Sequence, residues 1–221
     1  MLPTFGWPRE RLAYLMAGGE RALMQAIEGA EDDAEAGRAE LLALEPKPAD
    51  VLIAVAASGR TPYTVAVAEA AQAAGALVIG IACNPGTPLV LLADHGLCVG
   101  GAPELIAGST RLSAGTAQKA VLNAISTGVM VRLGRVHGNL MVGLKVTNDK
   151  LRRRAEALVA RLGRTDQEAA AAHLCAAGDD VRLAILLALG VAIPEATAAL
   201  AAAAGRLGEA ARALGVQTGW R

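Results

Sequence analysis

The sequence is poor in aromatic residues and carries no net charge. Phe, Trp and Tyr make up 2% of its 221 residues, and 21 Lys and Arg balance 21 Asp and Glu. Nucleic-acid binding relies on a positive surface that contacts phosphates and, for single strands, on aromatic side chains that stack on bases. The composition therefore argues against a nucleic-acid partner.

Long hydrophobic runs are also missing, although 53% of the residues are hydrophobic. Charged residues or glycine interrupt each apolar stretch well before the roughly 18 residues that a membrane span needs. The first residues do not show the basic segment followed by an apolar segment that marks a secretory signal. We therefore expect no membrane partner and a cytoplasmic location.

Cysteine and histidine are few and scattered, and they show neither a Cys-x-x-Cys pair nor the spacing of metal ligands. They are Cys83, Cys98, Cys175, His95, His137 and His173. This pattern excludes a disulfide framework or a zinc cage and fits a reducing compartment. The sequence thus predicts no metal and no cofactor.

Apolar runs that alternate with helical segments predict an α/β fold. Three runs bounded by turn residues, at 51–56, 77–82 and 96–99, are strand candidates, and the first two have the composition of buried strands. This spacing indicates a parallel sheet that helices cover on both faces. Helices are expected at 8–16, 20–30, 34–44, 62–74, 89–93, 116–133, around 140–146 and at 148–162.

The last part of the chain, from residue 165 onward, has the pattern of a separate helical unit. Three short helices are expected, at 166–176, 180–189 and 194–214. Thr165 and Glu168 have the spacing of a capping box. We expect a first domain at 1–164 and a small three-helix C-terminal domain at 165–221.

A short polar turn follows the first strand and opens the next helix. It consists of Ser58, Gly59, Arg60 and Thr61, hereafter the Ser58–Thr61 loop. Hydroxyls and unpaired backbone N–H groups at a helix N-terminus bind anions such as phosphate. Open α/β sheets also hold their ligands at the carboxyl ends of strands. The loop is a candidate phosphate site, although an ordinary polar turn explains the same residues.

A second hydroxyl-rich segment, 108–119, leads into the helix expected at 116–133. Ser109 and Thr110 can hydrogen-bond a sugar or a phosphate, and Lys119 can supply a positive charge. A long capping loop with a surface lysine is the alternative interpretation. Glu31 lies in an acidic run, where it is either a solvated helix end or a carboxylate for acid–base chemistry.

Several segments, taken in order, resemble N-acetylmuramic acid 6-phosphate etherases. These are bacterial enzymes of the sugar isomerase (SIS) class, related to the glucokinase regulatory protein. The resemblance covers nearly the whole chain. The segments that carry it are Pro3-Thr4-Phe5-Gly6, Gly18-Gly19, 28–33, 57–63, 83–86, 108–119 and 139–142.

The resemblance implies a homodimeric, three-layer α/β/α SIS domain with a small helical C-terminal domain. It implies a carbon–oxygen lyase that cleaves the D-lactyl ether of a phosphorylated amino sugar in cell-wall recycling, giving N-acetylglucosamine 6-phosphate and D-lactate. It makes Glu31 one of two catalytic carboxylates. The Ser58–Thr61 loop would hold the phosphate, and Ser109, Thr110 and Lys119 would line the pocket.

The chain also departs from the family pattern. In the family, a second catalytic glutamate immediately precedes the Pro-Thr-Phe-Gly stretch, and a first strand and a Gly-Thr-Ser-Gly-Arg loop lie further upstream. This chain begins at Met1, without these parts. A shortened form of a complete enzyme, a split enzyme, or a homologue that only binds sugar phosphates would each explain this. An aldose–ketose isomerase is a weaker alternative.

Overall fold

The computed structural model describes residues 6–100 and 103–220. The chain forms two compact units. The α/β unit comprises Ala13–Ala124, and the helical unit comprises Met1–Leu12 together with Ile125–Arg221. Pro3, Thr4 and Phe5 of the quoted motif lie outside the described residues. The predicted domain boundary after residue 164 stays a prediction.

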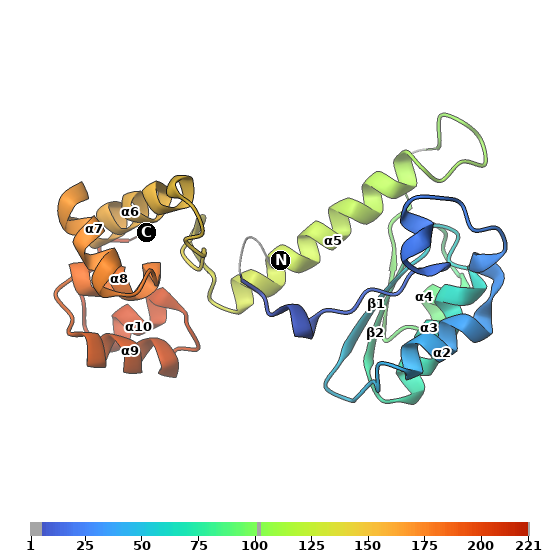
Figure 1. Cartoon of the computed structure of the whole chain (residues 1–221), viewed down its shortest axis with the longest axis horizontal. Helices are drawn as coiled ribbons and strands as arrows, with labels where there is room; N and C mark the ends of the chain where they lie inside the picture. The colour runs from blue at the N-terminus through green and yellow to red at the C-terminus, as the bar shows by residue number, and fades with distance from the viewer. Residues whose placement is uncertain (1–5, 101–102, 221) are drawn as a thin grey trace. The chain divides into compact units, whose positions relative to one another are not determined.

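The α/β unit contains a parallel sheet with the strand order β1-β2-β3. Helices α2, α3 and α4 lie together on one side of β1 and β2 (Figure 1). The predicted parallel α/β fold is therefore confirmed. The elements are α2 (Ala34–Leu42), β1 (Val51–Val55), α3 (Pro62–Ala73), β2 (Leu77–Ala82), α4 (Pro88–Leu92), β3 (His95–Cys98) and the first part of α5 (Ser113–Arg132).

The two faces of the sheet differ in burial. Ala54 and Val78 point toward the helices and belong to the hydrophobic core. On the opposite face Val51 is 56% exposed and Ile53 is 37% exposed. The expectation that the first strand is buried on both faces is wrong, because the helices α2, α3 and α4 pack on the other face.

The expected helices at 8–16 and 20–30 are also wrong. The described chain has short 3₁₀ helices there, at Arg9–Arg11, Gly19–Leu23 and Ala30–Asp32. Gly18 and Gly19 have φ values of 81° and 64°, which interrupt a right-handed helix. Tyr14 and Met24 are more than four-fifths exposed. Short helices depend on packing of an apolar face, and no residue of 8–30 is fully buried.

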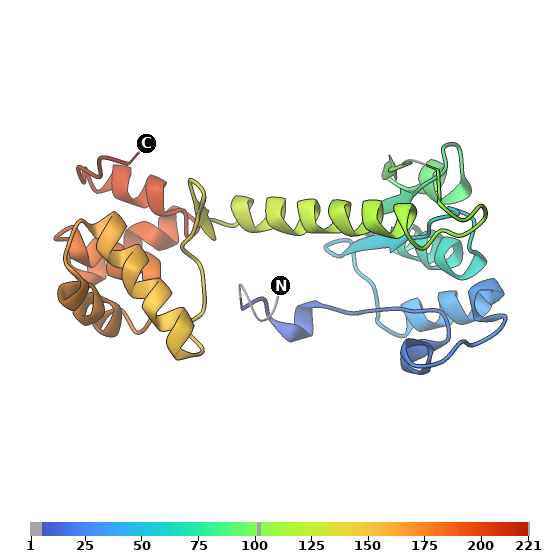
Figure 2. The ribbon, with the colours of Figure 1, turned by 90° about the horizontal axis from the view of Figure 1, so that it is seen from above.

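Five α-helices and a small hairpin follow α5 in the described part of the helical unit. The helices gather into one bundle (Figure 2) and share one hydrophobic core. The predicted helix at 148–162 is confirmed, whereas the helix expected around 140–146 is wrong, because residues 140–141 form a short strand and the residues that follow have no regular structure. The elements are β4 (Val136–His137), β5 (Leu140–Met141), α6 (Asp149–Gly163), α7 (Gln167–Ala176), α8 (Val181–Ala188), α9 (Ile193–Ala202) and α10 (Leu207–Ala213). Among the described residues, no helix has the length and apolar character of a membrane span.

Two corrections concern the helix ends in this unit. The helix predicted at 194–214 is two helices, because Ala204 and Gly205 between α9 and α10 have positive φ values of 50° and 78°. The N-cap of α7 is Asp166 rather than Thr165, since the Asp166 carboxylate accepts a hydrogen bond of 2.8 Å from the Ala169 N–H.

The four helices α7 to α10 form an internal repeat that the sequence analysis missed. Buried residues of α7 and α8 recur 26 positions later in α9 and α10, and the turn residues with positive φ recur as well. The matched buried pairs are Ala170/Ala196, Leu174/Leu200, Ala177/Ala203, Val181/Leu207, Ala184/Ala210 and Ile185/Ala211. Each pair of helices is therefore one copy of the same hairpin.

The repeat singles out Ala204. The first copy has Gly178 at the matched turn position, where φ is 58°, whereas Ala204 has a φ of 50° and carries a Cβ. We expect Ala204→Gly to raise the free energy of unfolding by about 0.5–1 kcal/mol, because relief of left-handed strain exceeds the added chain entropy. Urea denaturation measures this. The control Ala198→Gly, exposed inside α9, should lower the stability by a similar amount.

The C-terminal segment is held against the β4–β5 hairpin. The Trp220 indole N–H donates a hydrogen bond of 3.0 Å to the Leu162 carbonyl, and its ring lies edge-on to the His137 ring at 4.5 Å. Burial lowers the pKa of His137 below its usual 6.5. The neutral imidazole is therefore the form that this contact favours.

This pKa predicts a loss of stability in mild acid. Well above pH 6.5 His137 is neutral in both the folded and the unfolded chain, whereas as the pH falls toward 6.5 and below it the unfolded chain binds the proton more readily. The stability should fall as the pH drops from about 7.5 to 5.5, and less so in His137→Gln. Urea midpoints across this range check the difference, and an identical slope in both proteins would contradict it.

Candidate functional site

The Ser58–Thr61 loop lies where β1 ends and α3 begins. The Ser58 Oγ accepts a hydrogen bond of 3.1 Å from the Arg60 N–H and lies 3.5 Å from the Thr61 Oγ1. Thr61 is the N-cap of α3, but its side chain makes no capping hydrogen bond. The helix N-terminus and both hydroxyls therefore stay available to an anion, beside the exposed Arg60.

A neighbouring segment, 83–89, fixes the shape of this loop. The Cys83 N–H and the Asn84 side-chain amide both donate to the Ala57 carbonyl, at 2.9 and 3.3 Å, and the Leu89 N–H donates to the Gly59 carbonyl at 3.1 Å. The segment follows β2, so it meets the loop at the carboxyl edge of the sheet. These hydrogen bonds bring residues 84–88 against the Ser58–Thr61 loop.

Gly59 is required at the contact between the two segments. Its φ is 68°, and a Cβ on Gly59 would lie 2.1 Å from the Oγ1 of the fully buried Thr87. The Thr87 hydroxyl donates to the Asn84 carbonyl at 3.3 Å. Thr87 is a supporting residue that sequence reasoning did not assign, and the Pro-Gly-Thr-Pro run that holds it was the available signal.

Glu31 lies at the same end of the α/β unit as the Ser58–Thr61 loop, because it comes just before helix α2. Gly37 in α2 lies against the Tyr63 carbonyl in the first turn of α3, whereas Leu42 and Ala73 line one groove at the other ends. The two helices therefore start side by side. Glu31 lies just before α2, in a 3₁₀ turn that packs beside α3. Its side chain is exposed and forms no hydrogen bond or ion pair with another described residue.

Ser109 and Thr110 precede α5, whose start is already capped. The Glu104 carboxylate accepts hydrogen bonds of 2.9 Å from both the Ser113 and Ala114 N–H groups. These bonds lower the pKa of Glu104 below its usual 4.5. An anion at this loop would therefore depend on hydroxyls rather than on these two N–H groups.

The beginning of α5 lies close to the sheet edge. The Cys83 thiol lies 4.0 Å from the Ala114 carbonyl, which places the Ser109–Thr110 segment near the ends of the strands. Lys119 is exposed about two turns into the helix, and nothing described ties it to the Ser58–Thr61 loop. Two cavities, of about 450 and 340 Å³, are lined by other residues.

The chemistry of this edge is that of hydroxyls, N–H groups and a carboxylate. Among the described residues, no three His, Cys, Asp or Glu side chains gather as a metal site would require. The arrangement can hold an anionic group on the Ser58–Thr61 loop and present Glu31 from the neighbouring segment. It is an SIS-type α/β fold, with the loop at its carboxyl edge and a helical C-terminal region.

Comparisons with known proteins identify the family. Residues 1–72 match the glucokinase regulatory protein N-terminal SIS domain. The chain is 50% identical over 206 residues to the N-acetylmuramic acid 6-phosphate etherase of Deinococcus radiodurans, which covers 93% of this chain and 68% of that protein. The Rubrobacter xylanophilus etherase is 48% identical over 213 residues, covering 95% and 71%. Etherase 1 of Vibrio cholerae is 45% identical over 188 residues, covering 85% and 63%. The chain belongs to the N-acetylmuramic acid 6-phosphate etherase family.

Proposed function

We propose that this chain acts on N-acetylmuramic acid 6-phosphate and cleaves its D-lactyl ether. The observation that supports the proposal is that α2 and α3 start side by side, with Glu31 just before α2 and the Ser58–Thr61 loop just before α3. Family membership at up to 50% identity supports the substrate class. The products are N-acetylglucosamine 6-phosphate and D-lactate.

The Ser58–Thr61 loop holds the sugar phosphate in this proposal. Ser58 and Thr61 donate hydroxyl hydrogen bonds, the helix N-terminus adds partial positive charge, and the Arg60 guanidinium adds a full one. Ser109 and Thr110 bind sugar hydroxyls. Lys119 contributes positive charge to the pocket wall.

Glu31 takes part in the proton transfers. The proton at C2 of the open-chain sugar passes to a carboxylate, the electron pair forms a C2–C3 double bond, and the C3–oxygen bond breaks. The departing lactate oxygen takes a proton from an acid, and water then adds to the unsaturated sugar. Two carboxylates with different protonation states suit these tasks, and in this proposal Glu31 is the one that the given sequence contributes.

The remaining parts of the proposal concern assembly and location. We propose a homodimer, because apolar side chains of α5, such as Leu122 and Val129, are each 37% exposed. We place the reaction in the cytoplasm as part of a lyase step in cell-wall amino sugar recycling. Three free thiols support a reducing compartment.

An assay for D-lactate tests the function. The purified chain is incubated with N-acetylmuramic acid 6-phosphate, and D-lactate is measured with a coupled D-lactate dehydrogenase. Release of D-lactate together with N-acetylglucosamine 6-phosphate supports the proposal. A chain that neither releases D-lactate nor binds the sugar phosphate contradicts it.

A second candidate is a non-catalytic sugar-phosphate-binding module. The observation that favours it is the match of residues 1–72 to the domain of a regulatory protein. Binding of the sugar phosphate in calorimetry without any D-lactate release would establish this alternative.

A further inference from the structure

A cavity lined by both charged and apolar side chains lies within the helical unit and contains none of the residues assigned to the candidate site. It has a volume of about 340 Å³ and is bounded by the segment 142–147 and by the turn before α8. Apolar atoms of Val142, Leu144 and Val146 form part of its wall. The charged lining residues are Arg135, Lys145, Asp179, Asp180 and Arg182.

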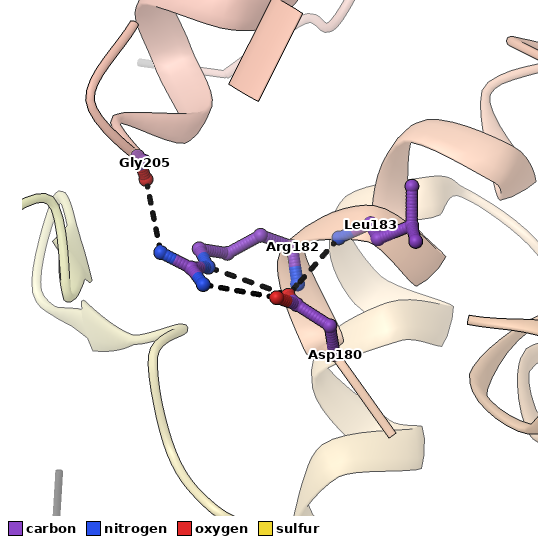
Figure 3. Close-up of polar contacts among 4 residues, drawn as sticks. All are labelled: Asp180, Arg182, Leu183 and Gly205. Carbon is purple, nitrogen blue, oxygen red and sulfur yellow. Dashed lines mark hydrogen bonds and ion pairs between the residues drawn. The ribbon is translucent and has the colours of Figure 1, made fainter. Parts of the chain in front are cut away.

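Both carboxylates of this cavity already have partners. Asp179 accepts two hydrogen bonds from the Arg152 guanidinium, at 3.0 and 2.9 Å. Asp180 accepts from the Arg182 guanidinium at 2.9 and 3.3 Å and from the backbone N–H of Leu183 at 3.3 Å (Figure 3). The negative charges of the wall are therefore neutralised before a ligand enters.

Two cations of the cavity have no such partner. Among the described residues, neither Arg135 nor Lys145 forms an ion pair or a side-chain hydrogen bond. The stem of Arg135 lies over Gly143, where a Cβ would come within 2.5 Å of its Cδ. Burial and the nearby Arg182 guanidinium both lower the pKa of Arg135, and Asp180 opposes them. The cavity lining thus carries more positive than negative charge, with three cations against two carboxylates.

We infer that this cavity binds a small phosphate dianion, either inorganic phosphate or the phosphate group of a small metabolite. A guanidinium fork and an ammonium group together match the two charges of phosphate near pH 7. Thr147 also lines the cavity, and its hydroxyl can donate a further hydrogen bond. An anion placed between Arg135 and Arg182 also relieves the repulsion between their guanidinium groups. This site is independent of the proposed function of the α/β unit.

The test localises phosphate binding by NMR. Inorganic phosphate is titrated into the ¹⁵N-labelled full chain at constant ionic strength, and the amide signals of the cavity residues Gly143 and Gly178 are followed. Arg135→Gln should weaken the affinity reported by these signals at least tenfold. Arg132→Gln, an exposed change at the end of α5, should leave it within twofold.

A second variant and a second ligand complete the test. Lys145→Gln alters an exposed side chain, so it tests the second cation with little risk to the fold, and it should weaken binding several-fold. A parallel titration with N-acetylglucosamine 6-phosphate distinguishes free phosphate from a phosphorylated sugar. Unmoved Gly143 and Gly178 signals, or equal affinities in Arg135→Gln and Arg132→Gln, overturn the inference. Signals of the Ser58–Thr61 loop report the other site separately.

Discussion

Replacing Glu31 with Gln is expected to lower the rate of D-lactate release by ~10²–10⁴-fold, the usual contribution of a general acid or base. The substitution keeps the shape of the side chain and removes its ability to exchange a proton. Glu31 is exposed and has no described partner, so the fold should be unaffected. The measurement is the coupled D-lactate assay, with the thermal midpoint recorded beside it.

The neighbouring acid provides the control for Glu31. Asp32→Asn removes an equally exposed charge from the same 3₁₀ turn, so it separates proton transfer from the general effect of negative charge. We expect its rate to stay within about threefold of the unmodified chain. Sugar-phosphate affinity should change little in either variant. A Glu31→Gln protein with the rate of Asp32→Asn would remove Glu31 from the mechanism.

Replacing Gly59 with Ala should destabilise the α/β unit by about 3 kcal/mol and weaken sugar-phosphate binding at least tenfold. Left-handed strain costs about 1–2 kcal/mol and overpacking about 1–3 kcal/mol. The new methyl group would press on Thr87, which is fully buried and cannot move aside freely. Urea denaturation measures the stability, and calorimetry with N-acetylglucosamine 6-phosphate measures the binding.

Gly86 offers a matched control for Gly59. It has a similar φ of 63°, but a Cβ there would meet nothing within 4 Å. Gly86→Ala therefore carries the backbone strain without the steric contact and should cost about 1 kcal/mol. Adding Thr87→Ala to Gly59→Ala removes the nearest atom and should restore part of the stability. Equal losses in the two glycine variants would show that the contact with Thr87 is unimportant.

The parallel α/β fold follows from local patterns in the sequence. The runs at 51–56 and 77–82 are rich in β-branched residues and have turn residues on both sides, so they are strands in almost any packing. The helix at 62–74 has Pro62 at its start and Gly75 just after its end, where φ is 81°. These signals act within a few residues, and therefore the sequence reveals them.

The features that sequence reasoning missed depend on tertiary contacts. Residues 20–30 have helical composition, but helix formation there needs a buried face that the fold does not provide. The capping of α5 by Glu104 joins residues nine and ten positions apart, beyond any local capping rule. The motifs were enough to propose which residues form the candidate site. The role of Thr87, which packs against Gly59, could be seen only from the contact between the two loops.

Because of the internal repeat, each hairpin of a refolding chain can pack on a hairpin of its own molecule or on one of another molecule. The two hairpins bury the same positions, so a hairpin from one molecule can pack on the complementary hairpin of another, which is the route to domain-swapped dimers. Arg182 breaks this equivalence, because its guanidinium reaches the Gly205 carbonyl at 3.4 Å, whereas the matched position of the second hairpin is Gly208. This hydrogen bond can form only when the first hairpin packs against the second, so Arg182 favours that pairing over the pairing of two identical hairpins.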